Sequence, residues 1–252
     1  MWAASARQLT DLIASGVLYV EVRRPDQEIS IGTAFHIGGG YCVTARHVIE
    51  GNTILRIGRR DTSLSTQFHP AGGHPVRTTR HGAHVWQVSD DRYNHPDARV
   101  DVSIIRLLGP NAHLVQPFLQ LSPTADVYSE GEFLMKEVVV LGYPPVPSSS
   151  DAHLVVFRGE VSAVIENRDN QRRQFVISGM ARGGFSGGPV VSVEAPNVVL
   201  GVVVESLMRN TEIEELGFIG ATTITTAFEI ADRHHLDIRE LQMTRQGFII
   251  GQ

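Results

Sequence analysis

Short apolar runs, separated by glycines and polar turns, fill most of this chain. Many are rich in β-branched residues, which is typical of strands in an antiparallel all-β fold. The first block of runs covers residues 17–22, 30–37, 40–49, 52–58 and 101–108. The second block covers residues 137–144, 154–166, 174–179, 188–193, 198–206 and 216–224. A polar, turn-rich stretch near residues 120–135 separates the two blocks.

Helical spacing of apolar residues is confined to the two ends of the chain. Leu9, Leu12 and Ile13 share one helical face before Gly16, which predicts a short helix over residues 3–15. Phe228, Ile230 and the residues around them predict a second helix over about residues 225–236.

Residues 59–99 form a long polar insertion between two of the apolar runs. The insertion contains five of the 11 histidines: His69, His74, His81, His84 and His95. Their spacing matches no standard metal site, so we expect a solvated loop and no bound metal. The insertion could serve as a lid, as a docking loop or as a regulatory arm, and the sequence does not choose among these roles.

Composition narrows the class of protein without naming a function. The chain has 252 residues, 42% of them hydrophobic, and a formal net charge of -5, which favours neither a nucleic-acid nor a membrane partner. Cys42 is the single cysteine, so no internal disulfide can form, and we interpret it as a small buried apolar residue. The N-terminal region matches a signal peptide poorly, and no run reaches membrane-spanning length, so a cytoplasmic location is expected.

One glycine-rich stretch, "RGGFSGGPVV" over residues 182–191, surrounds a single serine, Ser186. A serine hydroxyl becomes a useful nucleophile when a histidine takes its proton and a carboxylate holds that histidine in one tautomer. The stretch "YCVTARHVIEG" ends a β-like run and places His47 at the start of one helical turn, and in "DVSIIRL" Asp101 comes immediately before an apolar strand. Asp97 is the rival carboxylate; Asp101 is preferred because an apolar strand follows it at once.

The order His47, Asp101, Ser186 is that of the chymotrypsin-type triad. Together with "GTAFHI", "VLGYP", "RGEVSAV", "LGVVVES" and "LGFIGATTI", these motifs resemble the trypsin-like serine proteases, closest in texture to bacterial DegP/HtrA-type protease domains without a PDZ domain. The resemblance implies one peptidase domain over residues 1–252, built from two six-stranded antiparallel β-barrels. The first barrel is expected over about residues 17–125 and the second over about residues 133–225.

The resemblance also assigns roles around the serine. The amides of Gly184 and Ser186 are expected to form an oxyanion hole, and no cofactor is expected. Phe185 departs from the family, because digestive relatives have an aspartate there that pairs with a new N-terminus, and bacterial relatives usually have asparagine. Activation by that ion pair is therefore not expected.

The expected substrate pocket follows from the same resemblance. Its floor is Met180, its wall Val203, Val204 and Glu205, and Phe218 lies near its base. This set predicts a preference for medium-sized apolar side chains, whereas an inward-pointing Glu205 would favour basic ones.

These residues together predict a serine endopeptidase that acts on protein or peptide substrates. The alternative from another class is a binding module on a protease-like scaffold, silenced by a collapsed loop around Phe185. An intermediate case is a latent protease switched on by a partner protein, in stress response or in defence.

Overall fold

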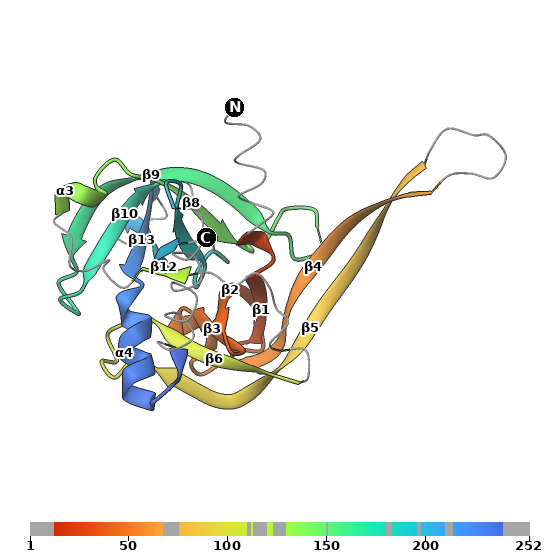
Figure 1. The fold of residues 1–252 in the computed structure, drawn as a ribbon, viewed down its shortest axis with the longest axis horizontal. Coiled ribbons are helices and arrows are strands. Elements are labelled where there is room, and N and C mark those ends of the chain that lie inside the picture. The colour runs from red at the N-terminus through yellow and green to blue at the C-terminus, as the bar shows by residue number, and fades with distance from the viewer. Residues whose placement is uncertain are drawn as a thin grey trace, which may run out of the picture.

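The structure is a computed structural model that describes residues 13–67, 76–109, 112, 120–122, 130–149, 151–179, 183–195, 198–209 and 214–238. The predicted N-terminal helix therefore lies almost wholly outside the described residues. Two sheets, each closed into a barrel, make up the body of the protein (Figure 1).

The first barrel is built from the N-terminal strands. Its strands are β1 (Val17–Arg23), β2 (Ile29–Gly38), β3 (Tyr41–Thr44), β4 (Thr53–Gln67), β5 (Val76–Asn94) and β6 (Ser103–Leu108). They follow one another in the order β1-β2-β3-β6-β5-β4, and β4 pairs back onto β1. Each pairing is antiparallel, as the alternating runs predict.

The second barrel repeats this architecture with the later strands. Its strands are β8 (Glu137–Gly142), β9 (Val155–Glu166), β10 (Arg173–Ser178), β11 (Pro189–Ser192), β12 (Val198–Arg209) and β13 (Glu214–Thr223). The pairing of β11 with β12 closes the ring. The predicted all-β fold of two six-stranded barrels is confirmed. The two-residue strand β7 (Gln120–Leu121), in the range expected for the first barrel, pairs instead with β12 of the second.

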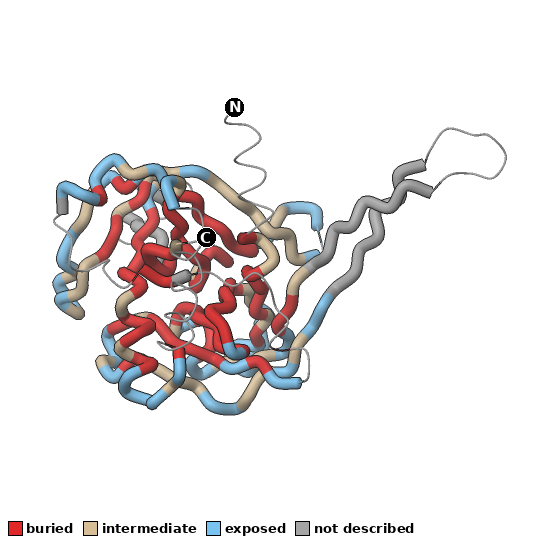
Figure 2. The backbone as a smooth tube through the Cα atoms, viewed as in Figure 1, coloured by how far each residue is buried: buried red, intermediate tan, exposed pale blue. Residues whose placement is uncertain are grey.

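Three apolar clusters explain why many strands are apolar on both faces. One fills the first barrel, with Leu18 and Val20 from β1, and another fills the second, with Val138 and Val140 from β8. The alternate residues of the same two strands join a third cluster that lies between the barrels. Because neighbouring residues of a strand point to opposite faces, β1 and β8 contribute to a barrel interior and to the junction at once. Figure 2 shows that buried residues are concentrated in the strands of the two barrels.

Three helices are described besides the strands. The helix α2 (Arg46–Ile49) follows β3 directly, and α3 (Glu130–Phe133) precedes β8. The helix α4 (Thr225–His234) confirms the predicted C-terminal helix, and its Ala227, Phe228 and Ile230 join the cluster between the barrels. In the part of the chain that the structure describes, no helix is both long and apolar enough to cross a bilayer.

The polar insertion differs from the solvated loop expected there. Residues on either side of the undescribed segment 68–75 pair as a continuous antiparallel ribbon, from Ile57 with Trp86 out to Gln67 with Val76. This ribbon is the outward continuation of β4 and β5, and it extends well away from the barrels (Figure 1). The residues of this ribbon are mostly polar and lack the apolar alternation from which a strand is predicted.

Candidate active site

His47 lies in a single helical turn at the end of β3. The neighbouring Val48 and Ile49 are buried in the core of the first barrel, so the short helix α2 is anchored by its apolar residues. His47 points the other way, with 51% of its side chain exposed. Anchoring on one side and exposure on the other leave the imidazole available to a substrate.

Asp101 holds His47 through two hydrogen bonds. Its Oδ2 lies 2.5 Å from His47 Nδ1, and its Oδ1 accepts the His47 backbone N–H at 2.8 Å. A carboxylate partner at Nδ1 selects the tautomer with the proton on that nitrogen, which leaves the lone pair of Nε2 free to take a proton. The Asp101 side chain is 31% exposed, and its carbonyl oxygen accepts the N–H of Arg46 at 3.3 Å.

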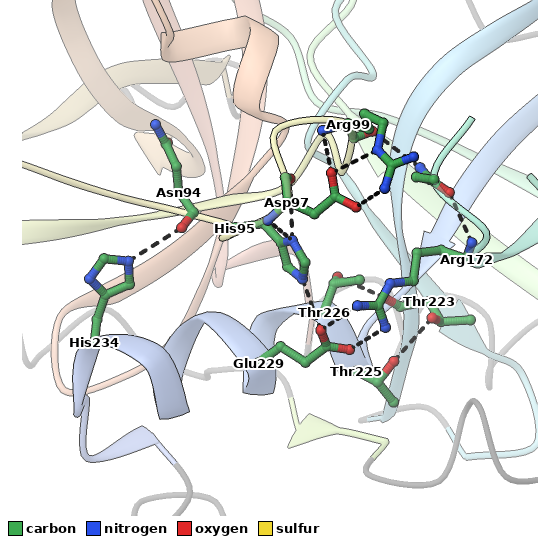
Figure 3. A network of polar contacts seen from close by, with 11 residues as sticks. Asn94, His95, Asp97, Arg99, Arg172, Thr223, Thr225, Thr226, Glu229 and His234 are labelled. Atoms are coloured by element: carbon green, nitrogen blue, oxygen red, sulfur yellow. Dashed lines mark hydrogen bonds and ion pairs between the residues drawn. The ribbon is translucent and has the colours of Figure 1, made fainter.

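The loop that leads to Asp101 is held by a polar cluster that joins both barrels to α4 (Figure 3). His95, with a side chain only 1% exposed, lies 3.0 Å from Glu229 on α4, and its Nδ1 accepts the N–H of Asp97 at 3.1 Å. Glu229 also receives two hydrogen bonds from Arg172, at 2.7 and 2.8 Å. His95, expected in a solvated loop, is thus a buried structural residue.

The rival carboxylate, Asp97, has another partner. It forms an ion pair with Arg99 at 2.8 Å. Hydrogen bonds that the Arg99 side chain and backbone donate to its carboxylate lower the pKa of Asp97 to about 2. Arg99 in turn donates to the carbonyl of Asp169, at the turn between β9 and β10. Of the two candidates, Asp101 is therefore the carboxylate that bonds to His47, and Asp97 is part of its support.

Ser186 lies on a glycine loop that packs against the strand end leading to His47. Its carbonyl oxygen accepts the N–H of Thr33 on β2 at 2.9 Å. The next residue, Gly187, has a φ of +86°, and a Cβ added there would lie 2.8 Å from the nitrogen of Ala45 and 2.1 Å from the oxygen of Thr33. Only glycine permits this close approach. The Ser186 loop therefore contacts Ala45, which lies two residues before His47 in the chain.

Gly184 has the backbone shape expected of an oxyanion-hole residue. Its φ is +102°, and an added Cβ would lie 2.5 Å from the Tyr143 oxygen and 2.6 Å from the Pro144 Cα. The carbonyl of Phe185 accepts the N–H of Gly188 at 2.8 Å, which directs the Ser186 N–H, in the same planar peptide, to the opposite side. Among the residues that the structure describes, none accepts a hydrogen bond from the amide of Gly184 or Ser186.

Phe185 anchors the loop by apolar burial. It is 3% exposed, belongs to the core of the second barrel, and contacts Phe157 edge-on at 5.3 Å between ring centroids. A Cβ on Gly142 would lie 2.5 Å from the Phe185 ring, so β8 runs directly against it. A buried aromatic ring thus takes the place of the aspartate of digestive relatives in holding the loop.

The expected pocket residues fall into three groups. Val203 and Val204 are buried, Val203 in the core of the second barrel and Val204 between the barrels. Val203 also bonds by its backbone to Gly187 and Gly188, which fixes β12 beside the serine loop. Phe218 on β13 is 38% exposed. Met180 and the Glu205 side chain lie outside the described residues.

Sequence reasoning missed Thr33, which contacts the serine loop from the first barrel. Its hydroxyl donates to the Gly184 carbonyl at 2.6 Å and accepts the Tyr143 N–H at 2.9 Å. The motif "GTAFHI" marks the strand, but only the fold shows that a hydroxyl on it faces a loop 151 residues away.

The two-barrel fold, the His47–Asp101 pair and the glycine-flanked serine are features of the trypsin-like peptidases. The chain matches the trypsin-like peptidase domain over residues 32–202, and it belongs to that family. No curated protein matches the chain by sequence.

Solved structures of bacterial-type proteases share the fold. The HtrA-type protease AlgW, solved with a tripeptide, is 17% identical with a TM-score of 0.58; the match covers 88% of this chain and 61% of that one. The active form of the Rv3671c protease from M. tuberculosis is 19% identical with a TM-score of 0.59, and the match covers 92% of this chain and 86% of that one. This chain thus spans less than two thirds of AlgW, and at these identities the likeness concerns the fold.

Proposed function

We propose that the protein hydrolyses peptide bonds through His47, Asp101 and Ser186. The observation that carries the proposal is the doubly bonded His47–Asp101 pair beside the glycine loop of Ser186. A histidine held in one tautomer next to a serine on a rigid, amide-presenting loop is the arrangement that acyl transfer requires.

The reaction proceeds in two halves. His47 Nε2 takes the proton of the Ser186 hydroxyl as the oxygen attacks the scissile carbonyl, and it then gives that proton to the leaving amine. The Ser186 acyl ester that forms is hydrolysed by water, which His47 activates in the same way. Asp101 orients the imidazole and stabilises its cationic form throughout.

The amides of Gly184 and Ser186 bind the negative oxygen of each tetrahedral intermediate. Each such donor contributes about 10²–10³ in rate, because it is already aimed where charge develops. The lack of other acceptors for these amides in the described part of the chain supports this role. It also favours an active protease over a silent binding module with a collapsed loop.

The substrate is a protein or peptide, and we propose a preference for medium-sized apolar side chains at the cleaved position. Met180, Val203, Val204 and Phe218 are the apolar residues expected around that pocket. Faster cleavage of fluorogenic peptides after Arg than after Leu, Val or Ala would reject this preference and point to Glu205. A cytoplasmic location completes the proposal, together with a partner protein, in stress response or defence, that gates access of protein substrates and leaves Ser186 itself reactive.

The Ser186→Ala variant tests the function as a whole. We expect it to fold like the wild type and to lose cleavage of proteins in a native lysate, by at least about 10⁴-fold. The matched control is Ser162→Ala, which removes an exposed serine of β9 and should cleave at the wild-type rate. Mass-spectrometric mapping of new chain ends measures both, and cut sites that persist in Ser186→Ala would contradict the assignment.

A further inference from the structure

Thr33 is a fully buried polar residue of β2 that faces the second barrel. Its side chain is 0% exposed, and it lies in a strand whose other buried residues are mainly apolar. A buried hydroxyl is costly unless it is hydrogen-bonded, so its partners show what the position is for.

Two of the three partners of the Thr33 hydroxyl and N–H are carbonyls of the proposed oxyanion-hole residues, and the third belongs to Tyr143, whose carbonyl lies against Gly184. The hydroxyl donates to the Gly184 carbonyl at 2.6 Å and accepts the Tyr143 N–H at 2.9 Å. The Thr33 N–H donates to the Ser186 carbonyl at 2.9 Å. One residue of the first barrel therefore fixes three backbone groups of the second.

The bond to Thr33 fixes the loop at a glycine, where the backbone could otherwise rotate. Gly184 links two peptide groups: the N–H of the first is a proposed oxyanion donor, and the carbonyl of the second is bound to Thr33. With a φ of +102° at a residue without a side chain, rotation about Gly184 is limited mainly by its contacts. The Gly184 N–H could turn away from the reacting oxygen by rotation about φ or ψ of Gly184. Because Thr33 fixes the Gly184 carbonyl, it restricts the rotation about ψ.

Thr33 is also tied to the segment that carries the base. Its carbonyl accepts the hydroxyl of Thr44 at 2.7 Å, and Thr44 is the last residue of β3, three positions before His47. The chain of bonds from Thr44 through Thr33 to Gly184 thus sets the distance between the base and the oxyanion donors.

We propose that Thr33 is a positioning residue for the oxyanion hole: its hydroxyl holds the peptide after Gly184 and so aims the two amides at the reacting carbonyl. The inference rests on the proposed function and deepens it. The sequence analysis assigns the oxyanion hole to residues of the glycine loop alone. The inference adds a residue of the first barrel that positions them.

The test compares Thr33→Val, Thr33→Ser and wild type in their reaction with a fluorophosphonate, whose oxygen occupies the oxyanion hole and which requires no known substrate. Valine keeps the shape but leaves the Gly184 carbonyl and the Tyr143 N–H unpaired, so we expect labelling to slow by about 10- to 100-fold. Serine keeps the hydroxyl and should label within about 3-fold of wild type. The pH midpoint of labelling should stay where the wild type has it, because His47 and Asp101 are untouched.

The control is Thr226→Val on α4, which removes another buried hydroxyl bond, to the carbonyl of Thr223 at the end of β13 (Figure 3). It should label at the wild-type rate. Equal rates for Thr33→Val and wild type would overturn the inference, as would a folded Thr33→Ser that is slowed as much as valine. The serine variant decides the question if the valine variant does not fold. Failure of the wild type itself to react would instead reject the proposed function.

Discussion

The two halves of the candidate site are held in opposite ways. The serine half is held by buried, neutral residues: Phe185 is packed in a barrel core, and Thr33 binds two carbonyls and one amide of the second barrel. The imidazole half is charged and partly exposed: His47 is 51% and Asp101 31% exposed, and ion pairs support the loop behind them.

The difference follows from what each half must do. Backbone amides stabilise an oxyanion only if they are aimed before the reaction, which demands a rigid, fully packed loop. An imidazole must exchange protons with serine, leaving group and water, which demands solvent access and orientation by a side chain. Breaking one half should therefore have a different signature from breaking the other.

Among changes to the groups that hold the two halves, Asp101→Asn, in the imidazole half, has the largest expected effect. Asparagine keeps the size of the side chain but favours the wrong tautomer of His47, so turnover should fall by about 10⁴-fold. Because Asp101 is partly exposed, we expect the melting temperature to change little. Peptide turnover and thermal unfolding measure the two effects, and Asp97→Asn is the matched control, with turnover within about 3-fold of wild type. Equal losses in both variants would contradict the assignment of Asp101.

Phe185→Ala is expected to disrupt the serine half by removing the packing that holds its loop. Removal of a ring that is 3% exposed should lower the free energy of unfolding by about 3–5 kcal/mol and loosen the loop that presents Ser186. Both stability and turnover should fall together, in contrast to Asp101→Asn. Denaturant unfolding and turnover below the melting transition measure this, and Phe185→Leu should recover most of both. A stable but inactive Phe185→Ala would show that the ring acts on the chemistry and not by packing.

The sequence could predict the barrels and propose residues for a triad, but it could not predict how the loops are held. Strand positions follow from apolar alternation, and His47, Asp101 and Ser186 follow from order and motif. The polar ribbon of β4 and β5 lacks that pattern, so the sequence predicts a loop there. The contacts of Thr33 and His95 cannot be read from the sequence, because their partners, Gly184 and Glu229, are 151 and 134 residues away along the chain.

The smallest expected effect comes from Glu229→Gln, behind the imidazole half. Loss of one charge from the cluster with Arg172 and His95 should cost about 1–2 kcal/mol of stability, because the ion pair is about one third exposed. The melting temperature should fall by about 2–8 °C, and by less in high salt, which screens the wild-type pair.

The control for this effect is Glu194→Gln, whose exposed pair with Lys136 spans 3.7 Å and should contribute almost nothing. Turnover of both variants should remain within about 3-fold of wild type. If the melting temperature of Glu229→Gln fell by the same amount at low and at high salt, this would contradict the view that ion pairs stabilise the imidazole half.

The central claim, that His47 activates Ser186, is tested most directly by identifying the residue that a fluorophosphonate modifies. Mass spectrometry of the intact protein and its peptides at neutral pH should place one adduct on Ser186 in the wild type. The same adduct should form at least about 10³-fold more slowly in His47→Ala, because a serine without its base is a poor nucleophile. An unmodified Ser186 in folded wild type, or equal labelling of the two proteins, would contradict the account.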